Sequence, residues 1–569
     1  MNNATEQTNK MVIYQVFPRW FGNLKSSPVK NGSIAENGVG KFSAFTLKSL
    51  SKIKELGITH IWYTGVIEHA TKTDYTAYGI RKDHEAVVKG MAGSPYAIKD
   101  YYDIDPDLAD KVENRMEEFE ALVERTHEAG MKVIIDFVPN HVARQYFSDA
   151  REVFVEDLGQ TDNRSKAFDP NNNFYYIPGQ TLTLHFGAQQ EDFEYSEFPA
   201  KVTGNNHFDA YPSLNDWYET VKLNYGVDYM NGGACYFDPV PNTWKKMLDI
   251  LLFWAKKGVD GFRCDMAEMV PVEFWNWVIP KVKELKDVVF IAEVYNPAEY
   301  QNYIYTGHFD YLYDKVGLYD TLRAVMCGQA PARNISYCWQ ALDGIQEHML
   351  NFLENHDEQR IASDFFAGNA RKGIPGMIVS AVMNTNPVMI YSGQELGERG
   401  MDEEGFSGLD GRTTIFDYWS VGTLRNWIDD WRFDGNKLSE EQKQLRQFYA
   451  QLLNLTGKEP VVVKGAFYDL MYANLKNPYF NTSQQYTFLR KWKNEVLLAV
   501  VNFDKAEQTV RIEIPTDAFN TLGISDNKAA VLMDLLTGDS CVSTLTDACP
   551  YQVTIPAYSG KLLKFTYKE

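Results

Sequence analysis

The sequence predicts an α/β protein: a (β/α)8 TIM barrel, a small domain inserted after its third strand, and a carboxy-terminal antiparallel β-sandwich. Three observations predict this fold. From Met11 to about Leu455, apolar runs of strand length alternate with amphipathic helical segments. Several of these runs are followed directly by polar residues, which is the arrangement at the active-site end of a barrel. Beyond about Pro460 strand-like runs continue, but the helical periodicity stops.

The first clear helix–strand unit lies between Arg115 and His141. One helical face is formed by Met116, Phe119, Val123 and Thr126. Gly130 follows and can adopt the left-handed backbone conformation that ends a helix. The β-branched run MKVIIDFVPNH comes next and ends in the polar residues Asp136, Asn140 and His141.

The same unit returns twice along the chain. A second helical face is formed by Trp244, Met247, Leu248, Leu251 and Ala255. Gly258 ends that helix, and the buried strand VDGFRCD follows. A third helical segment, around Trp277, Val282 and Leu285, precedes VVFIAE, which ends at Glu293. Strands that alternate with helices are joined by crossovers and run parallel.

A doubly wound open sheet is the alternative parallel architecture. It would place a glycine-rich phosphate-binding turn after its first strand. The first strand here, YQVFPRWF, is followed by no GxGxxG motif. The sequence therefore favours the barrel.

Two segments break the alternation. From Val142 to about Cys235 the chain is rich in Asn, Asp, Gly and aromatic residues without periodicity, and it is longer than an ordinary loop, so it predicts the inserted domain. The runs YTFLRKW, VLLAVVNF, TVRIEIP and KLLKFTY, separated by turns without a helical pattern, predict the sandwich. The expected boundaries are 1–141 and 236–458 for the barrel, 142–235 for the insert and 459–569 for the sandwich.

Composition and charge exclude some classes of function. The 569-residue chain has a formal net charge of −20, which repels nucleic-acid phosphates, so no nucleic-acid partner is expected. Aromatic residues make up 14% of the chain, more than a generic core needs, and their flat faces also stack on sugar rings. No run of about 18 apolar residues occurs, so no membrane span is expected.

The compartment and the cysteine chemistry have open alternatives. The amino-terminal segment MNNATEQTNK lacks the apolar stretch of a signal peptide, so the protein is either cytoplasmic or exported with a signal that precedes this numbering. The six cysteines form no CxxC pair and no zinc spacing. Cys541 and Cys549 are close enough for a hairpin disulfide, or they are two small buried thiols. The oligomeric state is not predicted.

Four successive strand ends concentrate acidic and basic residues. These are DFVPNH (136–141), GFRCD (261–265), IAEVY (291–295) and ENHD (354–357). One acid at a strand end is often a structural ion-pair partner. Several acids in one pocket repel each other and lose solvation, so their presence together favours a chemical role.

Glycoside hydrolysis needs carboxyl groups in two protonation states. One must be protonated to donate to the leaving oxygen, and another must be ionised to attack or support the anomeric carbon. Arg263 lies two positions before Asp265, so both side chains point to one face of a strand and the guanidinium favours the ionised carboxylate. We expect the carboxylates around Glu293 to keep it protonated as the acid.

Taken in order, these segments resemble the signature regions of the α-amylase family of retaining glycoside hydrolases, which includes α-amylases, neopullulanases and maltogenic amylases. YQVFPRWF is similar to the first barrel strand of the family, LGITHIWYTGV to the second, YAIKDYYDIDP to the segment entering the third helix, and YSGQELGE to the eighth. The likeness extends over nearly the whole chain and rests on the order and spacing of the segments.

The resemblance implies the catalytic roles. Asp265 would be the nucleophile that forms a covalent glycosyl-enzyme, and Glu293 would be the general acid/base. Asp357 would be the carboxylate that distorts and orients the sugar through its hydroxyl groups.

The resemblance also implies five residues around the sugar on the non-reducing side of the cleaved bond. His141, Arg263 and His356 would surround this sugar, and Asp136 would be a supporting acid. Tyr96 would stack its ring on the sugar. A lone histidine is more often structural than functional, but His141 and His356 each lie beside a matched motif residue.

Two further aromatic residues have places in the resemblance. Tyr295 follows the acid where family members often carry an aromatic on the leaving-group side. Trp217 lies in DWYETVKLNYG (216–226), near the end of the insert, where it would line the substrate cleft together with Tyr218 and Asn224. Packing of the insert onto the barrel is the alternative role for these three side chains.

The chain departs from the family pattern after the nucleophile. Many members carry Lys-His three and four positions on, whereas this chain has Glu268 and Met269. Glu268 would accept hydrogen bonds from sugar hydroxyls on the leaving-group side instead. The chemistry requires no cofactor, but Asn140 matches a frequent ligand of a structural calcium ion. Further oxygen donors in the insert are Asp162, Asp169 and Asp209.

The sequence thus predicts a hydrolase of α-1,4-glucosidic bonds in starch-derived glucans or malto-oligosaccharides. The alternatives are a transglycosylase that uses the same glycosyl-enzyme, and activity on sucrose, trehalose or α-1,6 linkages. An inactive carbohydrate-binding member is disfavoured because Asp265, Glu293 and Asp357 are all present. A metal-dependent barrel enzyme is disfavoured because no HxH or HExxH motif occurs.

Overall fold

Eight parallel strands close into a barrel in the computed structural model, which describes residues 10–184, 195–342 and 344–568. Each strand pairs with the next along the chain, and the eighth pairs with the first. The strands are β1 (Val12–Val16), β2 (His60–Tyr63), β5 (Lys132–Phe137), β12 (Gly261–Cys264), β13 (Val289–Ala292), β14 (Tyr311–Tyr313), β15 (Met349–Phe352) and β16 (Val388–Tyr391). The predicted TIM barrel is confirmed.

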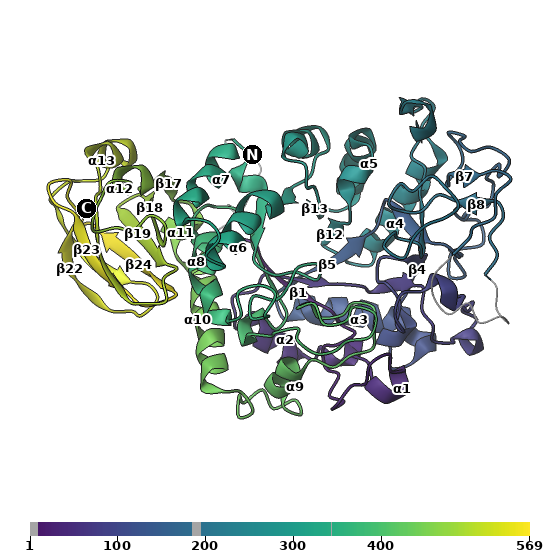
Figure 1. Ribbon diagram of the computed structural model, residues 1–569, viewed down its shortest axis with the longest axis horizontal. Coiled ribbons are helices and arrows are strands. Elements are labelled where there is room, and N and C mark those ends of the chain that lie inside the picture. Colours follow the sequence, from purple (N-terminus) through teal and green to yellow (C-terminus); the bar gives the residue numbers. More distant parts are fainter. Residues whose placement is uncertain (1–9, 185–194, 343, 569) are drawn as a thin grey trace.

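Helices connect the strands (Figure 1). They are α1 (Ile34–Asn37), α2 (Leu47–Lys54), α3 (Arg115–Glu128), α4 (Asn242–Lys256), α5 (Val272–Leu285), α6 (Asp320–Met326), α7 (Ile335–Ala341), α8 (Gly373–Val382), α9 (Gly422–Ile428) and α10 (Glu440–Lys458). The expected helix after β2 ends before Gly130, whose φ of 75° is left-handed as predicted. A π-helical turn, Asn302–Thr306, stands between β13 and β14 in place of a long α-helix.

The barrel interior is filled by side chains that point inward from the strands. Because side chains alternate along a strand, every second residue enters the interior. The interior cluster consists of Met11, Ile13, Trp62, Ile134, Ile291, Tyr313, Tyr319, Leu350, Phe352 and Met389. This packed interior leaves only the carboxyl ends of the strands for binding.

An antiparallel hairpin between β2 and α3, and the segment after β5, build one wall above the barrel. The hairpin is formed by β3 (Ile67–His69) and β4 (Ile98–Ile104). The later segment contains three two-stranded pairs: β6 (His141–Ala143) with β9 (Thr220–Lys222), β7 (Tyr176–Ile177) with β8 (Ala200–Lys201), and β10 (Val227–Asp228) with β11 (Ala234–Cys235). Its small apolar cluster includes Tyr175, Val202 and Tyr218.

Antiparallel sheets form the carboxy-terminal part, which lies at the opposite end of the long axis from β7 and β8 (Figure 1). One sheet has the order β17 (Ala466–Asp469), β18 (Gln485–Trp492), β19 (Glu495–Asn502), β24 (Ser559–Thr566), β21 (Ala529–Asp534) and β22 (Ser540–Thr544). The other pairs β20 (Gln508–Ile512) with β23 (Tyr551–Ile555). The predicted antiparallel β-sandwich is consistent with this arrangement.

Three short helices in this part were not predicted. They are α11 (Pro460–Val463), α12 (Met471–Asn474) and α13 (Thr516–Leu522). The longest, α13, has seven residues, and two turns are too few to reveal a helical period in the sequence. Gly523, with φ of 60°, ends it.

Two interpretations of the cysteines were wrong. In the part of the chain that the structure describes, all six cysteines are free thiols. Cys541 and Cys549 are both exposed, so they are neither a hairpin disulfide nor a pair of buried thiols. Among residues 10–184, 195–342 and 344–568, no helix has both the length and the apolarity needed to cross a bilayer.

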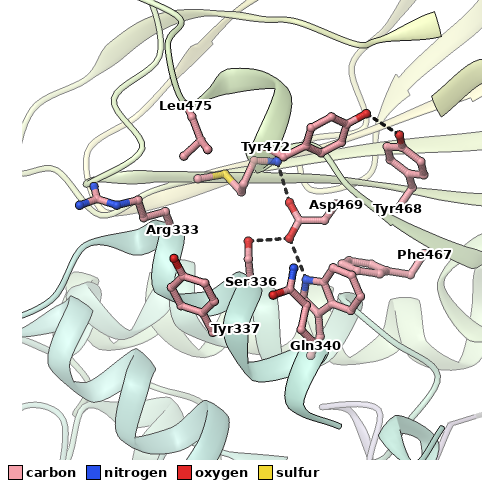
Figure 2. Close-up of a pocket in the computed structure, with 11 residues that line it drawn as sticks. Arg333, Ser336, Tyr337, Gln340, Phe467, Tyr468, Asp469, Tyr472 and Leu475 are labelled. Atoms are coloured by element: carbon pink, nitrogen blue, oxygen red, sulfur yellow. Dashed lines mark hydrogen bonds between the residues drawn. The ribbon is translucent and has the colours of Figure 1, made fainter. Parts of the chain in front are cut away.

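Asp469 joins the carboxy-terminal part to the barrel. Its Oδ2 accepts hydrogen bonds from Ser336 Oγ at 2.6 Å and Trp339 Nε1 at 2.7 Å, both on α7. The same oxygen accepts from Tyr486 OH on β18 at 2.9 Å. Figure 2 shows the bond from Ser336 to Asp469, beside a pocket of about 450 Å3 that residues of both parts line.

Candidate active site

The predicted catalytic residues lie at adjacent strand ends because the hydrogen-bond ladder continues past the strands. In the register of the barrel Arg263 on β12 is opposite Asp136 on β5. Directly after β12, Asp265 N donates to Phe137 O at 2.9 Å. Directly after β13, Glu293 N donates to Cys264 O at 3.1 Å. The two carboxyl groups therefore leave neighbouring strands at the same level of the barrel.

Arg263 lies at the centre of the carboxylate cluster and is fully buried. Its Nη1 donates to Asp265 Oδ1 at 2.8 Å, and its Nη2 donates to Glu293 Oε2 at 2.8 Å. Nη1 also lies 3.4 Å from Asp136 Oδ1, and Nε donates to Tyr313 OH at 3.1 Å. One guanidinium thus contacts three acids, and its planar fork fixes two of them relative to each other.

Glu293 has a complete set of hydrogen-bond donors. Besides Arg263, its Oε2 accepts from the backbone N–H of Met266 at 2.9 Å. Its Oε1 accepts from Tyr295 OH. Met266 has φ of 44° and ψ of 42°, a left-handed conformation that is unfavourable for a residue with a side chain. This turn places the Met266 amide against the carboxyl group of the neighbouring strand.

Asp136 is buried beneath the cluster and bonded to aromatic side chains. Its Oδ2 accepts from Trp62 Nε1 at 3.0 Å and from Gly65 N at 3.3 Å, and its Oδ1 accepts from Tyr96 OH at 3.2 Å. Burial raises the pKa of the Asp136 carboxyl, although Arg263 opposes the rise. Asp136 is therefore held by donors at both of its oxygens beneath Arg263.

His356 connects Tyr96 to Asp357. Its Nε2 is 2.7 Å from Tyr96 OH and 3.0 Å from Asp357 Oδ2, and its Nδ1 is 2.8 Å from Gln15 Nε2. The rings of Tyr96 and His356 stack with centroids 5.2 Å apart. The side chain of Asp357 remains 43% exposed, so it presents a carboxylate to the cleft while its neighbours are buried.

His141 lies on the other side of Asp265, with Nε2 4.0 Å from Asp265 Oδ2. Burial, followed by the charges of Lys222 and Lys89, lowers the pKa of His141 to about 3, so the imidazole is neutral in the working range of pH. The ring of Trp217 lies 5.2 Å from that of His141. Trp217 is partly exposed, so it borders the cleft.

The two acids that face the cleft have opposite pKa shifts. Burial raises the pKa of Asp265 well above its usual value, Arg263 opposes the rise, and Glu293 and Asp357 add to it. For Asp357 desolvation is outweighed by the charge and hydrogen bond of His356, with Arg263 and Arg412, and the pKa falls to about 2. Carboxyl groups this close titrate as a unit, so the cluster keeps a proton at a pH where isolated carboxyls are ionised.

The structure separates the roles of the three insert residues. Trp217 alone reaches the cleft. Tyr218 is 5% exposed and belongs to the small apolar cluster of the insert. Asn224 is fully buried, and its Nδ2 donates to Asp169 O at 2.8 Å. Tyr218 and Asn224 therefore make their contacts within the insert, whereas the alternative role expected for them was packing of the insert onto the barrel.

Glu268 fastens the loop that follows β13. Its Oε2 accepts backbone N–H bonds from Tyr295 at 3.1 Å and from Asn296 at 3.0 Å. Backbone amides occupy Oε2, so the expected acceptance of hydrogen bonds from sugar hydroxyls would fall to Oε1 and stays a prediction.

The residues around Asn140 do not fit a calcium ion. Asn140 Oδ1 accepts from Lys222 Nζ at 2.6 Å, and both residues are buried. The three aspartates proposed as further donors bond elsewhere: Asp162 to the amides of Asn173 and Phe174, Asp169 to Lys166, and Asp209 to His207. The amine of Lys222 thus occupies the position that the expected cation would take. Burial lowers the pKa of Lys222 to about 7.

Sequence reasoning missed three residues of the site: Gln15, Trp62 and Tyr313. Each lies on a barrel strand, and their bonds fix His356, Asp136 and Arg263. The alternation of side chains along a strand could have identified them, because each is a polar or hydrogen-bonding side chain at an inward position of an otherwise apolar strand. The pocket beside Asp469 in Figure 2 shares no residue with this site.

Comparisons with known proteins identify similar sequences and structures. The family description "Alpha amylase, catalytic domain" matches residues 15–417. Neopullulanase 2 of Thermoactinomyces vulgaris is 20% identical over 580 residues, which cover 98% of this chain and 78% of that protein. The cyclomaltodextrinase of Thermoanaerobacter pseudethanolicus is 21% identical over 525 residues, which cover 89% of this chain and 72% of that protein.

Solved structures share the fold over the whole length. A noncanonic maltogenic α-amylase from Thermotoga neapolitana has a TM-score of 0.62 and 20% identity, with 98% of this chain and 99% of that chain covered. An α-amylase from Geobacillus thermoleovorans, solved with acarbose, has a TM-score of 0.62 and 19% identity, with the same coverage.

Proposed function

The chain belongs to the α-amylase family of glycoside hydrolases, and from this premise we propose that it hydrolyses α-1,4-glucosidic bonds in starch-derived glucans or malto-oligosaccharides with retention of configuration. The names of its relatives, a neopullulanase and a cyclomaltodextrinase, support substrates derived from starch. The chemistry needs no cofactor, because carboxyl groups supply both the nucleophile and the proton.

One observation carries the proposal. Arg263 bonds Asp265 through Nη1 and Glu293 through Nη2, each at 2.8 Å. The two carboxyl groups are therefore held side by side at the mouth of the barrel, in a cluster that retains a proton. A double displacement needs one ionised and one protonated carboxyl group on opposite sides of the scissile bond.

In the first step Asp265 attacks the anomeric carbon and Glu293 protonates the glycosidic oxygen. Asp265 Oδ1 is bonded to Arg263, so Oδ2 is the attacking oxygen. Glu293 Oε2 already accepts from Arg263 and the Met266 amide, so Oε1 carries the proton that leaves with the sugar. The C–O bond breaks, an ester to Asp265 forms, and the leaving sugar departs with a hydroxyl group.

In the second step water replaces the leaving sugar. Ionised Glu293 removes a proton from the water, whose oxygen attacks the anomeric carbon and releases Asp265. The product keeps the starting configuration, and Glu293 regains its proton.

The remaining residues of the site bind the sugar. The exposed carboxylate of Asp357, ionised by its low pKa, accepts hydrogen bonds from sugar hydroxyls, and His356 and Tyr96 fix its position. Neutral His141 donates to a hydroxyl beside Asp265. Trp217 offers an apolar ring at the edge of the cleft, and Tyr295 borders the acid.

The test is chromatography of the products formed from maltoheptaose by the wild type and by Asp265→Asn. We expect shorter maltodextrins from the wild type and a loss of at least about a thousandfold in rate for the variant, because it lacks the nucleophile. Proton NMR of the first product should show the α-anomer before mutarotation.

The matched control is Asp364→Asn, which changes an exposed acid paired with Arg399 and should leave the rate unchanged. Products longer than the substrate would show that the enzyme is a transglycosylase, which transfers the sugar from the same glycosyl-enzyme to another carbohydrate. Full activity in Asp265→Asn would exclude Asp265 as the nucleophile.

A further inference from the structure

A second group of acids lies on the hairpin between β2 and α3, apart from the catalytic carboxylates. It consists of Glu68 on β3, Asp100 and Asp103 on β4, and Asp149 beyond β6. One carboxylate oxygen from each residue lies within 4.8 Å of the others. No step of the proposed hydrolysis uses any of them.

An irregularity in the hairpin brings these acids together. Glu68 pairs with Asp100, but its neighbour Ile67 pairs with Ile104, so one step along β3 corresponds to four residues of β4. In a regular strand Asp100 and Asp103 would point to opposite faces. The bulge turns both toward Glu68, and bulges of this kind are built features rather than defects.

Glu68 is the residue that points to a ligand. It is 1% exposed, and neither of its carboxylate oxygens accepts a hydrogen bond from any residue that the structure describes. The nearest cation is Lys99, whose Nζ lies 3.8 Å from Oε1 and is itself bonded to Asp83 Oδ2 at 3.0 Å. Buried carboxylates normally accept hydrogen bonds, form ion pairs or bind a metal ion. Glu68 accepts no hydrogen bond from any described residue.

The other three acids have oxygens with backbone or arginine donors. Asp100 accepts from the amides of Tyr102 at 2.8 Å and Ala150 at 3.0 Å. Asp103 accepts from Arg115 at both oxygens, from Nε at Oδ1 and from Nη2 at Oδ2, and Oδ1 also accepts from the Ile104 amide at 2.7 Å. Asp149 is exposed. With Lys99 and Arg115 as the cations in contact, the four carboxyls have an excess of two negative charges when all are ionised.

We propose that Glu68, Asp100, Asp103 and Asp149 bind one divalent, oxygen-preferring cation, and that this cation is calcium. Calcium binds oxygens at about 2.3–2.6 Å, so opposite ligands lie roughly 4.6–5.2 Å apart, and the spacing of the four oxygens fits. Magnesium needs about 2.0–2.1 Å and therefore a tighter group of oxygens. Backbone carbonyls and water complete the coordination.

The electrostatics of the site agree with this geometry. Burial, with the charge of Asp103, raises the pKa of Glu68 well above its usual value. Burial likewise raises the pKa of Asp100 to about 6. These acids are unfavourable as bare carboxylates, and a bound cation removes that penalty.

The cation would link two segments that border the active site. Asp100 and Asp103 lie on β4, which begins two residues after Tyr96, and Asp149 lies in the first loop of the insert, next to Ala150, whose amide bonds Asp100. The site therefore ties the insert to the hairpin that carries Tyr96. Its expected effect is on the stability of this wall and not on a chemical step.

The test uses the full chain, freed of metal with a chelator and then titrated with calcium chloride in a calorimeter. We expect one calcium ion per chain, a rise in the thermal midpoint on binding, and magnesium binding at least about tenfold weaker. Terbium luminescence sensitised by Tyr101 and Tyr102, next to the site, should be displaced by calcium.

Glu68→Gln is the decisive variant. It should weaken calcium binding at least about tenfold, while its metal-free form melts no lower than the metal-free wild type, because an amide replaces a buried carboxylate that accepts no hydrogen bond from a described residue. Asp149→Asn changes the exposed acid of the site. It should weaken calcium binding to the same extent, while every buried side chain stays as in the wild type. Glu152→Gln, an exposed acid of the neighbouring loop, is the control and should bind as the wild type does.

Three results would overturn the proposal. The first is no binding by the wild type at millimolar calcium. The second is unchanged affinity in both Glu68→Gln and Asp149→Asn. The third is loss of binding in Asn140→Ala with retention in Glu68→Gln, which would place the ion beside Lys222.

Discussion

Arg263 opposes the effect of burial on the ionisation of Asp265. Its guanidinium contacts Asp265, Glu293 and Asp136, all within a buried site where charges interact strongly. Burial raises the pKa of Asp265, and Arg263 is the largest influence that opposes the rise. The ionisation of the proposed nucleophile is therefore a balance between desolvation and one arginine.

The pH profile of hydrolysis should report this balance. Asp265 must be ionised to attack, so kcat/KM falls as the pH decreases through its raised pKa, and the acidic limb should lie above the usual aspartate value of about 4. Arg263→Gln removes the charge that opposes the rise, so we expect the acidic limb to move to higher pH. The loss of a buried donor should also lower kcat by roughly a hundredfold or more.

Arg412→Gln is the control for this measurement, because Arg412 acts on Asp357, whose pKa of about 2 lies below the acidic limb. It should leave the limb in place. An acidic limb that stays or moves down in Arg263→Gln would contradict the assignment of Asp265.

At the residue scale, sequence patterns predicted the side chains that follow strands better than those within them. Asp265 and Glu293 come directly after β12 and β13, and Asp357 follows β15 by a short polar segment, so their position at the barrel mouth follows from the fold. Gln15 and Tyr313 lie within strands, where alternation can predict that they point inward but not which residues they contact. Their partners became evident only once the barrel register set His356 and Arg263 beside them.

At the scale of elements, the loops after β12 and β13 act as one unit. The 3₁₀ turn Ala267–Met269 after β12 carries Glu268, which accepts two amides of the loop after β13. That loop carries Tyr295, whose hydroxyl donates to Glu293. The position of Tyr295 therefore depends on a carboxylate supplied by the preceding loop.

Glu268→Lys should separate the two loops, because lysine has no acceptor for the amides of Tyr295 and Asn296. We expect kcat/KM for maltoheptaose to fall about tenfold through misplacement of Tyr295. Glu268→Gln keeps a carbonyl acceptor and should retain most of the activity with the same thermal midpoint. Equal activity of the Lys and Gln variants would show that the contact has no positioning role.

Elements with a long regular period were predicted, and irregular ones were missed. Helix α3 repeats its apolar face over 14 residues, and the period identified it. The hairpin β3–β4 was missed because three extra residues in β4 interrupt the alternation that marks a strand. The same bulge that hides the hairpin in the sequence assembles the acids around Glu68.

At the scale of the whole molecule, part-buried and buried polar contacts join the barrel to the carboxy-terminal sheets. Asp469 accepts from Ser336 and Trp339 on α7. Arg490, fully buried on β18, donates to Val382 O at the end of α8. The Arg490 bond is costly to break because the separated groups are buried and water does not replace the lost partner.

Asp469→Ala should weaken this junction. We expect a loss of about 2–3 kcal/mol in unfolding free energy, since Trp339 and Ser336 lose their acceptor, measured by urea denaturation followed by tryptophan fluorescence. Asp517→Ala removes an exposed carboxylate that accepts a hydrogen bond from Tyr468 within the carboxy-terminal part. This change should lower the unfolding free energy far less. Equal losses in the two variants would show that Asp469 has only local importance.

The contact between Lys222 and Asn140 gives the insert an anchor of a different kind from the proposed ion site. The Lys222 amine is part of the chain and cannot diffuse away. It is therefore present in every molecule, whatever the composition of the solution. A bound ion exchanges with the solvent, and its occupancy follows the concentration outside. With calcium at the hairpin, the insert would always be held at β9 by Lys222. Its attachment at Asp149 would depend on the calcium concentration. A chelator would then loosen the wall beside Tyr96 and leave the base of the insert at β6 and β9 in place.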